Sequence, residues 1–130
     1  MPKVLVVEDN VTSRIAMVHM LDRLGIKADS AANGNEAVQR MRQWRYELIL
    51  MDIEMPEMDG FEATAAIRAH EVVHNLSPAL IIAVSASGEK DRAIAVGMND
   101  YLEKPATAIC LLKIIDDWLP AEKRSHWSPE

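Results

Sequence analysis

The chain has 130 residues, of which 49% are hydrophobic and 26% charged, a composition typical of one globular domain. Its 14 Lys and Arg residues face 20 Asp and Glu residues, a net charge of −6 that argues against nucleic-acid binding, which needs clustered cations. The single cysteine excludes an internal disulfide, no apolar stretch is long enough to cross a bilayer, and the N-terminus lacks a signal peptide's apolar core, so we expect a cytoplasmic domain without membrane insertion.

The first half of the chain alternates strand patterns with helix patterns. A β-branched run over residues 4–7 predicts a buried strand, and residues 12–24 predict a helix that Gly25 ends. The helical spacing comes from Ile15, Val18, Leu21 and Leu24, which we expect on the buried face. A weaker strand over residues 27–31 is followed by a helix near residues 36–43.

The second half continues the same alternation. Strand patterns cover residues 48–51, 79–84 and 101–103, and helix patterns cover residues 61–70, 89–96 and 106–119. Asp59 is placed to cap the first of these helices, and Cys110 is expected to be buried in the last. The domain then covers residues 1–120, and residues 121–130 are expected to form a flexible tail.

Strands that alternate with helices in this way predict an α/β fold. Right-handed crossovers between such strands give a parallel sheet with helices on both faces. The strands are almost continuously apolar, as expected when both faces of a sheet are covered. We therefore predict one doubly wound domain.

Reactive side chains stand at the end of four predicted strands. Glu8 and Asp9 follow the first strand, Asp52 the third, Ser85 the fourth and Lys104 the fifth. Ligands of open parallel sheets bind at the carboxyl ends of the strands, so we expect these groups to lie together. Carboxylates that converge repel one another unless a cation lies among them, and a site of oxygen ligands suits Mg²⁺.

These groups together suit phosphoryl transfer. Asp52 could act as a nucleophile that forms an aspartyl phosphate. Lys104 and the Mg²⁺ would offset the charge of the phosphoryl group, while the Ser85 hydroxyl would donate to one of its oxygens.

The sequence resembles the receiver domains of two-component response regulators and hybrid sensor kinases. The matching motifs are Glu8-Asp9-Asn10, residues 51–60 around Asp52, Val84-Ser85-Ala86 and residues 97–105 up to Lys104-Pro105. The resemblance covers residues 3–119, and its motifs occur in the family's order. It implies the flavodoxin-like strand order 2-1-3-4-5, with five strands and five helices.

The resemblance also implies a role for individual residues. Asp52 would be the phospho-acceptor, and Glu8 and Asp9 the acidic pair that binds Mg²⁺ beside it. Glu54 would ligate Mg²⁺ through its backbone carbonyl, which leaves its side chain free to face solvent. The remaining roles are those of Ser85 as the switch hydroxyl, Tyr101 as the aromatic that rotates inward on phosphorylation, and a cis peptide bond between Lys104 and Pro105.

The partners implied are a histidine kinase, a histidine-phosphotransfer protein, or both. Motifs at residues 8–10 and 97–101 look most like the hybrid-kinase and phosphorelay branch. We expect a monomer or weak dimer, but the sequence does not define the pathway, the lifetime of the phosphoryl group, or whether the domain stands alone.

Three alternatives remain at the level of sequence. Taken singly, Glu8 and Asp9 could cap a helix, Asp52 could lie in a turn and Lys104 could be a solvated charge. An aspartate-nucleophile phosphatase is a second hypothesis, although 130 residues leave no room for a substrate cap. A receiver that signals without phosphorylation is the third.

Overall fold

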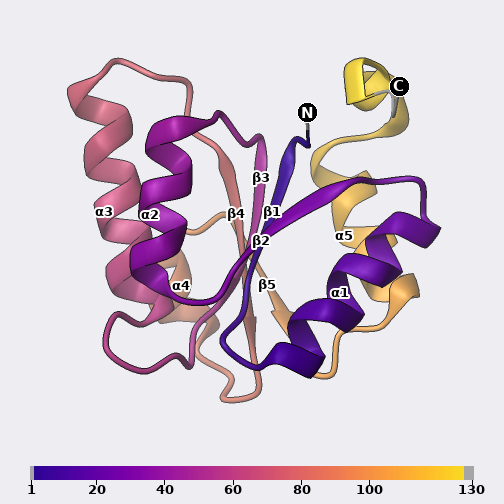
Figure 1. The fold of residues 1–130 in the computed structure, drawn as a ribbon, viewed down its shortest axis with the longest axis horizontal. Coiled ribbons are helices and arrows are strands. Elements are labelled where there is room, and N and C mark those ends of the chain that lie inside the picture. The colour runs from indigo at the N-terminus through magenta and orange to yellow at the C-terminus, as the bar shows by residue number, and fades with distance from the viewer. Residues whose placement is uncertain (1, 128–130) are drawn as a thin grey trace.

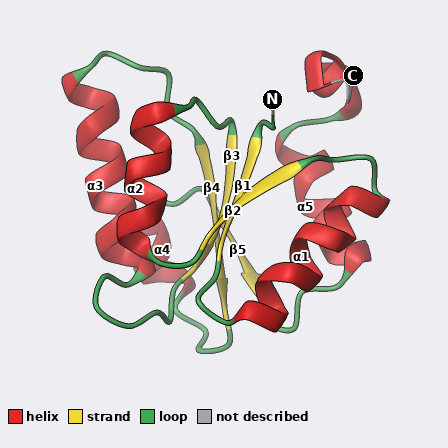
Figure 2. Ribbon diagram, viewed as in Figure 1, coloured by secondary structure: helices red, strands yellow, loops and turns green. Residues whose placement is uncertain are grey.

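A computed structural model describes residues 2–127 of the chain. Five parallel strands form one sheet in the order β2-β1-β3-β4-β5, which confirms the predicted flavodoxin-like order (Figures 1 and 2). The strands are β1 (Val4–Val7), β2 (Ala28–Ala31), β3 (Leu48–Asp52), β4 (Leu80–Ser85) and β5 (Asp100–Glu103). The helices are α1 (Val11–Arg23), α2 (Gly34–Gln43), α3 (Gly60–Val73), α4 (Lys90–Ala95) and α5 (Ala108–Trp118).

The sheet is buried between two layers of helices. Helices α2, α3 and α4 cover one face, and α1 and α5 cover the other (Figure 1). A hydrophobic core lies on each face of the sheet. Because successive side chains of a strand point to opposite faces, Leu5 and Val7 belong to the core under α2, α3 and α4, whereas Val4 and Val6 belong to the core under α1 and α5. This two-sided burial explains why β1, β3 and β4 contain almost no polar residues before their last positions.

Side-chain caps mark the start of α1 and α3, which follow loops at the carboxyl edge of the sheet. The Asn10 side chain accepts from the Ser13 N–H at the start of α1. Asp59 and Glu62 form a capping box at the start of α3, as the sequence predicted for Asp59. The loops after β1 and β3 therefore end at capped helices, whereas α4 begins without a side-chain cap.

Two helix faces differ from the sequence prediction. Ile15 of α1 is 64% exposed, and Met17 is buried beside Leu21 instead. In α5 the buried residues are Leu111, Ile114 and Ile115, whereas Cys110 is exposed and not buried as predicted. Short helices that contact a sheet at an angle bury only part of an apolar stripe, so spacing alone does not identify the buried members.

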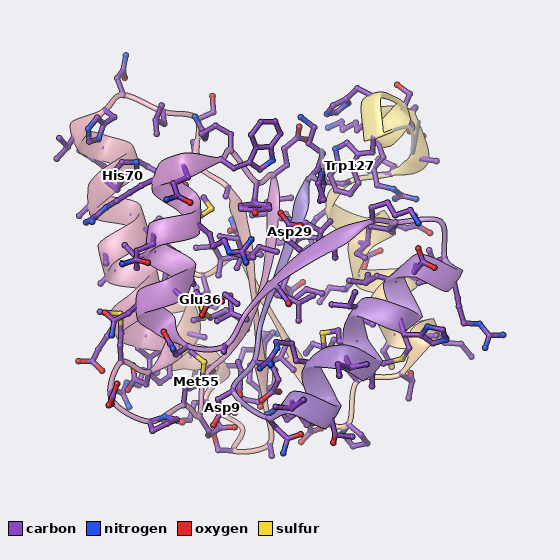
Figure 3. The ribbon with its side chains drawn as sticks, in the orientation of Figure 1. Asp9, Asp29, Glu36, Met55, His70 and Trp127 are labelled. Atoms are coloured by element: carbon purple, nitrogen blue, oxygen red, sulfur yellow. The ribbon has the colours of Figure 1, made fainter. Side chains whose placement is uncertain are left out.

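The region predicted as a flexible tail contains a 3-10 helix, η1 (Ala121–Trp127). The Trp127 Nε1 donates to Glu47 Oε1 at 3.0 Å, and His126 Nε2 lies 2.7 Å from Glu47 Oε2. Trp127 also packs against the core under α1 and α5, at the end of the sheet opposite Asp9 (Figure 3). Local sequence did not reveal these contacts because the partners are far apart in the chain; residues 128–130 of the predicted tail lie outside the described residues.

Arg68 ties α3 to the starts of β4 and β5 through one hydrogen-bonded network. Its guanidinium donates to the carbonyls of Ala79 and Gly97 at 2.8 and 2.9 Å, to Asn99 Oδ1 at 2.9 Å and to Glu71 Oε1 at 2.8 Å. Glu71 is 3% exposed, and its other oxygen accepts from the Ala79 N–H at 2.7 Å. The network thus satisfies a buried carboxylate and the backbone around it.

We expect Arg68→Met to lower the free energy of unfolding by about 3 kcal/mol, because it leaves the buried Glu71 carboxylate without its charged partner. Urea denaturation measures the change. The matched control is Lys27→Met, which removes an exposed ion pair with Asp22 and should cost less than about 1 kcal/mol. Equal costs for the two variants would show that the Arg68 network does not hold the fold.

Candidate functional site

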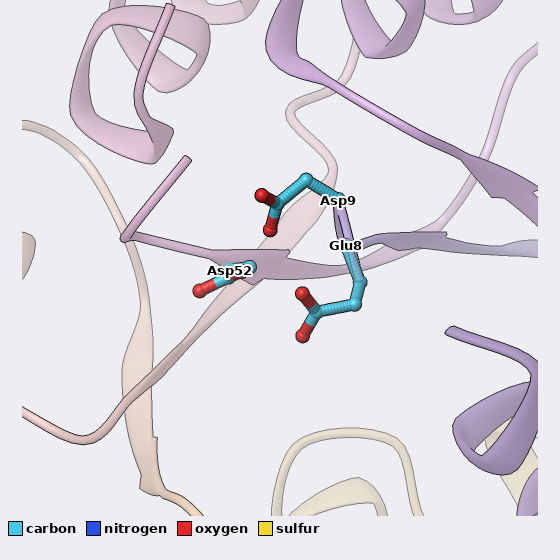
Figure 4. A group of neighbouring side chains, drawn as sticks. All are labelled: Glu8, Asp9 and Asp52. Atoms are coloured by element: carbon cyan, nitrogen blue, oxygen red, sulfur yellow. The ribbon is translucent and has the colours of Figure 1, made fainter. Parts of the chain in front are cut away.

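The register of the parallel sheet brings an acid from β1 next to an acid from β3. Val7 pairs with Met51, so Glu8 and Asp52 follow on neighbouring strands at the carboxyl edge. This is also the point where the strand order reverses between β1 and β3, the position at which open α/β sheets bind ligands. Figure 4 shows the carboxylates of Glu8, Asp9 and Asp52 gathered there.

Lys104, directly after β5, forms ion pairs with the two buried acids, Glu8 and Asp52. Its Nζ lies 3.0 Å from Asp52 Oδ1 and 3.3 Å from Glu8 Oε1. The Lys104 backbone N–H donates to the Ser85 carbonyl at 2.9 Å, and the peptide bond to Pro105 is cis, as the resemblance implied. Residues from the ends of β1, β3 and β5 therefore meet at one point, as the sequence predicted.

Burial and crowding shape the charge of these groups. Burial raises the pKa of the Asp52 carboxyl to about 7, and the neighbouring Glu8 adds to the rise while Lys104 opposes it. Burial also acts to lower the pKa of Lys104, but the hydrogen bond and charge of Asp52 and the charge of Glu8 raise it overall. The site thus holds more negative charge than Lys104 neutralises.

The acidic groups fit a divalent cation. One carboxylate oxygen from each of Glu8, Asp9 and Asp52 lies within 4.8 Å of the other two. Within residues 2–127, Asp52 Oδ2 is buried and has no hydrogen-bond partner. An unpartnered buried carboxylate oxygen in an all-oxygen cluster suits a hard ion such as Mg²⁺.

Ser85 and Tyr101 lie beside this acidic cluster. Ser85 ends β4 and is fully buried. The Tyr101 hydroxyl donates to the Ser85 carbonyl at 3.2 Å and accepts from the Gly88 N–H at 2.8 Å. Tyr101 is half-buried, so its ring links β5 to the loop that follows Ser85.

Glu54 differs from the expectation that its side chain is free to face solvent. The residue is exposed, yet its carboxylate accepts hydrogen bonds from the hydroxyls of Ser85 and Ser87. Burial acts to raise its pKa, but these hydrogen bonds lower it overall. The sequence offered no signal for this contact, because Glu54 and Ser85 belong to different strand ends whose side chains meet only in the folded protein.

The matching family is described as the response regulator receiver domain, and it covers residues 4–116. Hybrid signal transduction histidine kinase G of Dictyostelium discoideum is 41% identical over 121 residues, which span 91% of this chain and 4% of that protein. The chain thus corresponds to a small part of this curated relative. No helix within residues 2–127 has both the length and the apolar character to cross a membrane.

Solved structures of receiver domains resemble this chain in both fold and sequence. The receiver domain of Ssk1 from Saccharomyces cerevisiae, crystallised with the histidine phosphotransfer protein Ypd1, is 35% identical with a TM-score of 0.84, over 90% of this chain and 88% of that one. The receiver domain of sensor histidine kinase PA1611 from Pseudomonas aeruginosa is 36% identical with a TM-score of 0.78, over 91% and 98% of the two chains. That structure has a magnesium ion in its active-site cleft.

Gly60 lies against the backbone of Asp52 and has no room for a side chain. A Cβ at this position would stand 2.5 Å from the Asp52 carbonyl oxygen and 2.8 Å from Ile53 Cα. Although alanine normally favours helix over glycine, we expect Gly60→Ala to destabilise the protein by about 1–3 kcal/mol, since the clash is with backbone. Urea denaturation measures this; Ala69→Ser, at an exposed site of the same helix, is the control, and a Gly60→Ala protein as stable as the wild type would contradict the prediction.

Proposed function

Because the chain belongs to the response regulator receiver domain family, we propose that it is a phosphorelay switch that accepts a phosphoryl group on Asp52. The observation that supports this most is the buried Asp52 carboxylate, which has one oxygen held by Lys104 at 3.0 Å and the other without a partner among the described residues. An acid held in this way keeps one oxygen free to act as a nucleophile beside the positive charge of Lys104.

The donor in this proposal is a phosphohistidine on a partner protein. An oxygen of the Asp52 carboxylate attacks phosphorus, the new O–P bond forms as the N–P bond breaks, and the bonding electrons return to the imidazole, which takes up a proton. Hydrolysis restores the unphosphorylated state, because water attacks phosphorus and the Asp52 O–P bond breaks, which releases inorganic phosphate and the carboxylate. Lys104 stabilises the charge of the phosphoryl group throughout.

Mg²⁺ is the proposed cofactor. The carboxylates of Glu8, Asp9 and Asp52 and the backbone carbonyl of Glu54 would hold it, and it would supply positive charge against the phosphoryl oxygens. The magnesium ion in the related PA1611 receiver and the acidic cluster of this chain support this assignment.

The phosphoryl group would change the conformation through Ser85 and Tyr101. In the proposed active state, Ser85 donates its hydroxyl to a phosphoryl oxygen and Tyr101 turns inward. The face built from α4, β5 and α5 then repacks. The domain is a signalling switch and not a conventional enzyme, and any catalysis concerns only its own phosphorylation and dephosphorylation.

The proposed donor is a histidine-phosphotransfer protein or histidine kinase. Val11 and Ile15 of α1 are 56% and 64% exposed, and Arg14 of the same helix donates to the Glu8 carbonyl at 2.9 Å. An apolar surface therefore adjoins the acidic site, where a partner that brings phosphohistidine to Asp52 would dock. The complex of the related Ssk1 receiver with Ypd1 supports such a partner. We further propose a cytoplasmic location and a monomer or weak dimer.

Phosphorylation is tested with acetyl phosphate as the donor and Mg²⁺ present. We expect close to one phosphoryl group per chain in the wild type, because Asp52 is the single proposed acceptor, and none in Asp52→Asn or after chelation of Mg²⁺. Phosphate-affinity gels measure the stoichiometry. Asp117→Asn, on the exposed side of α5, is the control that should label normally.

Two further measurements, phosphate-monoester turnover and Mg²⁺ binding, separate the alternatives. Continuous turnover of phosphate monoesters that is lost in Asp52→Asn would indicate a phosphatase. Absence of label in the wild type despite measurable Mg²⁺ binding would indicate a receiver that signals without phosphorylation.

The partner surface gives a separate prediction. We expect Ile15→Arg to slow phosphoryl transfer from a phosphorylated histidine-phosphotransfer protein by about tenfold or more, because it puts a charge in the apolar contact. Transfer from acetyl phosphate should not change, since that donor needs no docking. Val72→Arg, at an 80% exposed site on α3, is the matched control, and equal effects of the two variants would rule out docking at α1.

A further inference from the structure

The Glu54 carboxylate holds the loop that follows β4. Its Oε2 accepts from the Ser85 hydroxyl and lies 2.9 Å from the Ser87 hydroxyl. Its Oε1 lies 3.4 Å from the Ala86 N–H. The last residue of β4 and the first two residues of the loop after it thus contact a single carboxylate that belongs to the loop after β3.

The hydroxyl of Ser85 has only one hydrogen to donate. It lies close to both Glu54 Oε2 and, at 2.8 Å, the Ser87 Oγ. The Ser87 backbone N–H donates to Ser85 Oγ at 3.0 Å, so the Ser85 oxygen already accepts one hydrogen bond. A hydrogen bond from a hydroxyl to a carboxylate is stronger than one between neutral groups, and this favours Glu54 as the acceptor of the Ser85 hydrogen.

We propose that Glu54 is a positioning residue that holds the Ser85 hydroxyl in the unphosphorylated protein and competes with the phosphoryl group for it. This inference rests on the proposed function, in which Ser85 donates to a phosphoryl oxygen. One hydroxyl hydrogen cannot serve Glu54 and the phosphoryl group at once, so the switch must break the contact with Glu54 before Ser85 can turn. The strength of that contact therefore sets part of the balance between the two states.

The contact also reaches Tyr101 through the same loop. Ser85 and Gly88 both bond the Tyr101 hydroxyl, at 3.2 and 2.8 Å. Release of Ser85 and Ser87 from Glu54 removes hydrogen bonds that hold this loop. Within residues 2–127, no hydrogen bond joins Glu54 to Tyr101. The carboxylate of Glu54 thus acts on β5 through Ser85.

Beryllofluoride, a phosphoryl mimic that binds an aspartate carboxylate, measures this competition as an equilibrium. We expect Glu54→Gln to bind beryllofluoride with Mg²⁺ about tenfold more tightly than the wild type, because a neutral acceptor holds the Ser85 hydroxyl less strongly. Glu54→Ala should bind at least as tightly as Glu54→Gln. Titration followed by amide NMR gives the dissociation constants, and the amides of Ala86 and Ser87 in the free proteins report loss of the contact.

A double-mutant cycle with Ser85→Ala separates positioning from simple charge repulsion. If Glu54 acts through Ser85, the gain from Glu54→Gln should fall to less than about twofold in the Ser85→Ala background. The control Glu57→Gln removes an exposed charge of the neighbouring loop and should leave the affinity unchanged. An equal gain with and without the Ser85 hydroxyl, or the same gain from Glu57→Gln, would overturn the proposal.

The proposed function fails separately from this inference. If wild-type Asp52 binds no beryllofluoride and takes no label from acetyl phosphate, the phospho-acceptor assignment is wrong. If Asp52 labels normally and the cycle shows no coupling between Glu54 and Ser85, only the positioning role of Glu54 is wrong.

Discussion

Two buried strands, β1 and β3, run parallel and end at the same edge, and their register sets Glu8 beside Asp52. Each carboxylate is almost completely buried, so their mutual repulsion acts where water screens it least. Burial and, after it, the neighbouring Glu8 raise the pKa of Asp52 to about 7, although Lys104 offsets part of the charge from the end of β5. A divalent cation at this edge would relieve that repulsion and offset the charge of an incoming phosphoryl group. The chemistry of the site is thus linked directly to the order of the strands.

The same edge also holds the groups that would respond to the phosphoryl group. Ser85 ends β4, the strand on the other side of β3, and Tyr101 of β5 bonds its carbonyl. In the free protein the Glu54 carboxylate accepts the hydrogen bond of the Ser85 hydroxyl, which a phosphoryl oxygen would accept in the proposed active state. The free state is therefore held by specific hydrogen bonds and not only by the absence of the phosphoryl group, and such a state can be tuned by single side chains.

Much of this arrangement could be predicted from the sequence. The apolar runs of β1, β3 and β4 identify buried parallel strands, and the acids at the ends of β1 and β3 then had to meet at one edge. The buried face of α1 was harder, because Ile15 fits the helical spacing but is exposed. The Glu54–Ser85 contact and the packing of Trp127 near Glu47 could not be predicted, since each depends on side-chain directions across elements that are distant in the chain.

The central claim is that Asp52, and no other group, receives the phosphoryl group. Borohydride reduces an acyl phosphate of aspartate to homoserine, so reduction after treatment with acetyl phosphate and Mg²⁺ marks the modified residue for peptide mass spectrometry. The account predicts homoserine at position 52 alone. Modification of Glu8, Asp9 or a histidine in place of Asp52 would contradict it.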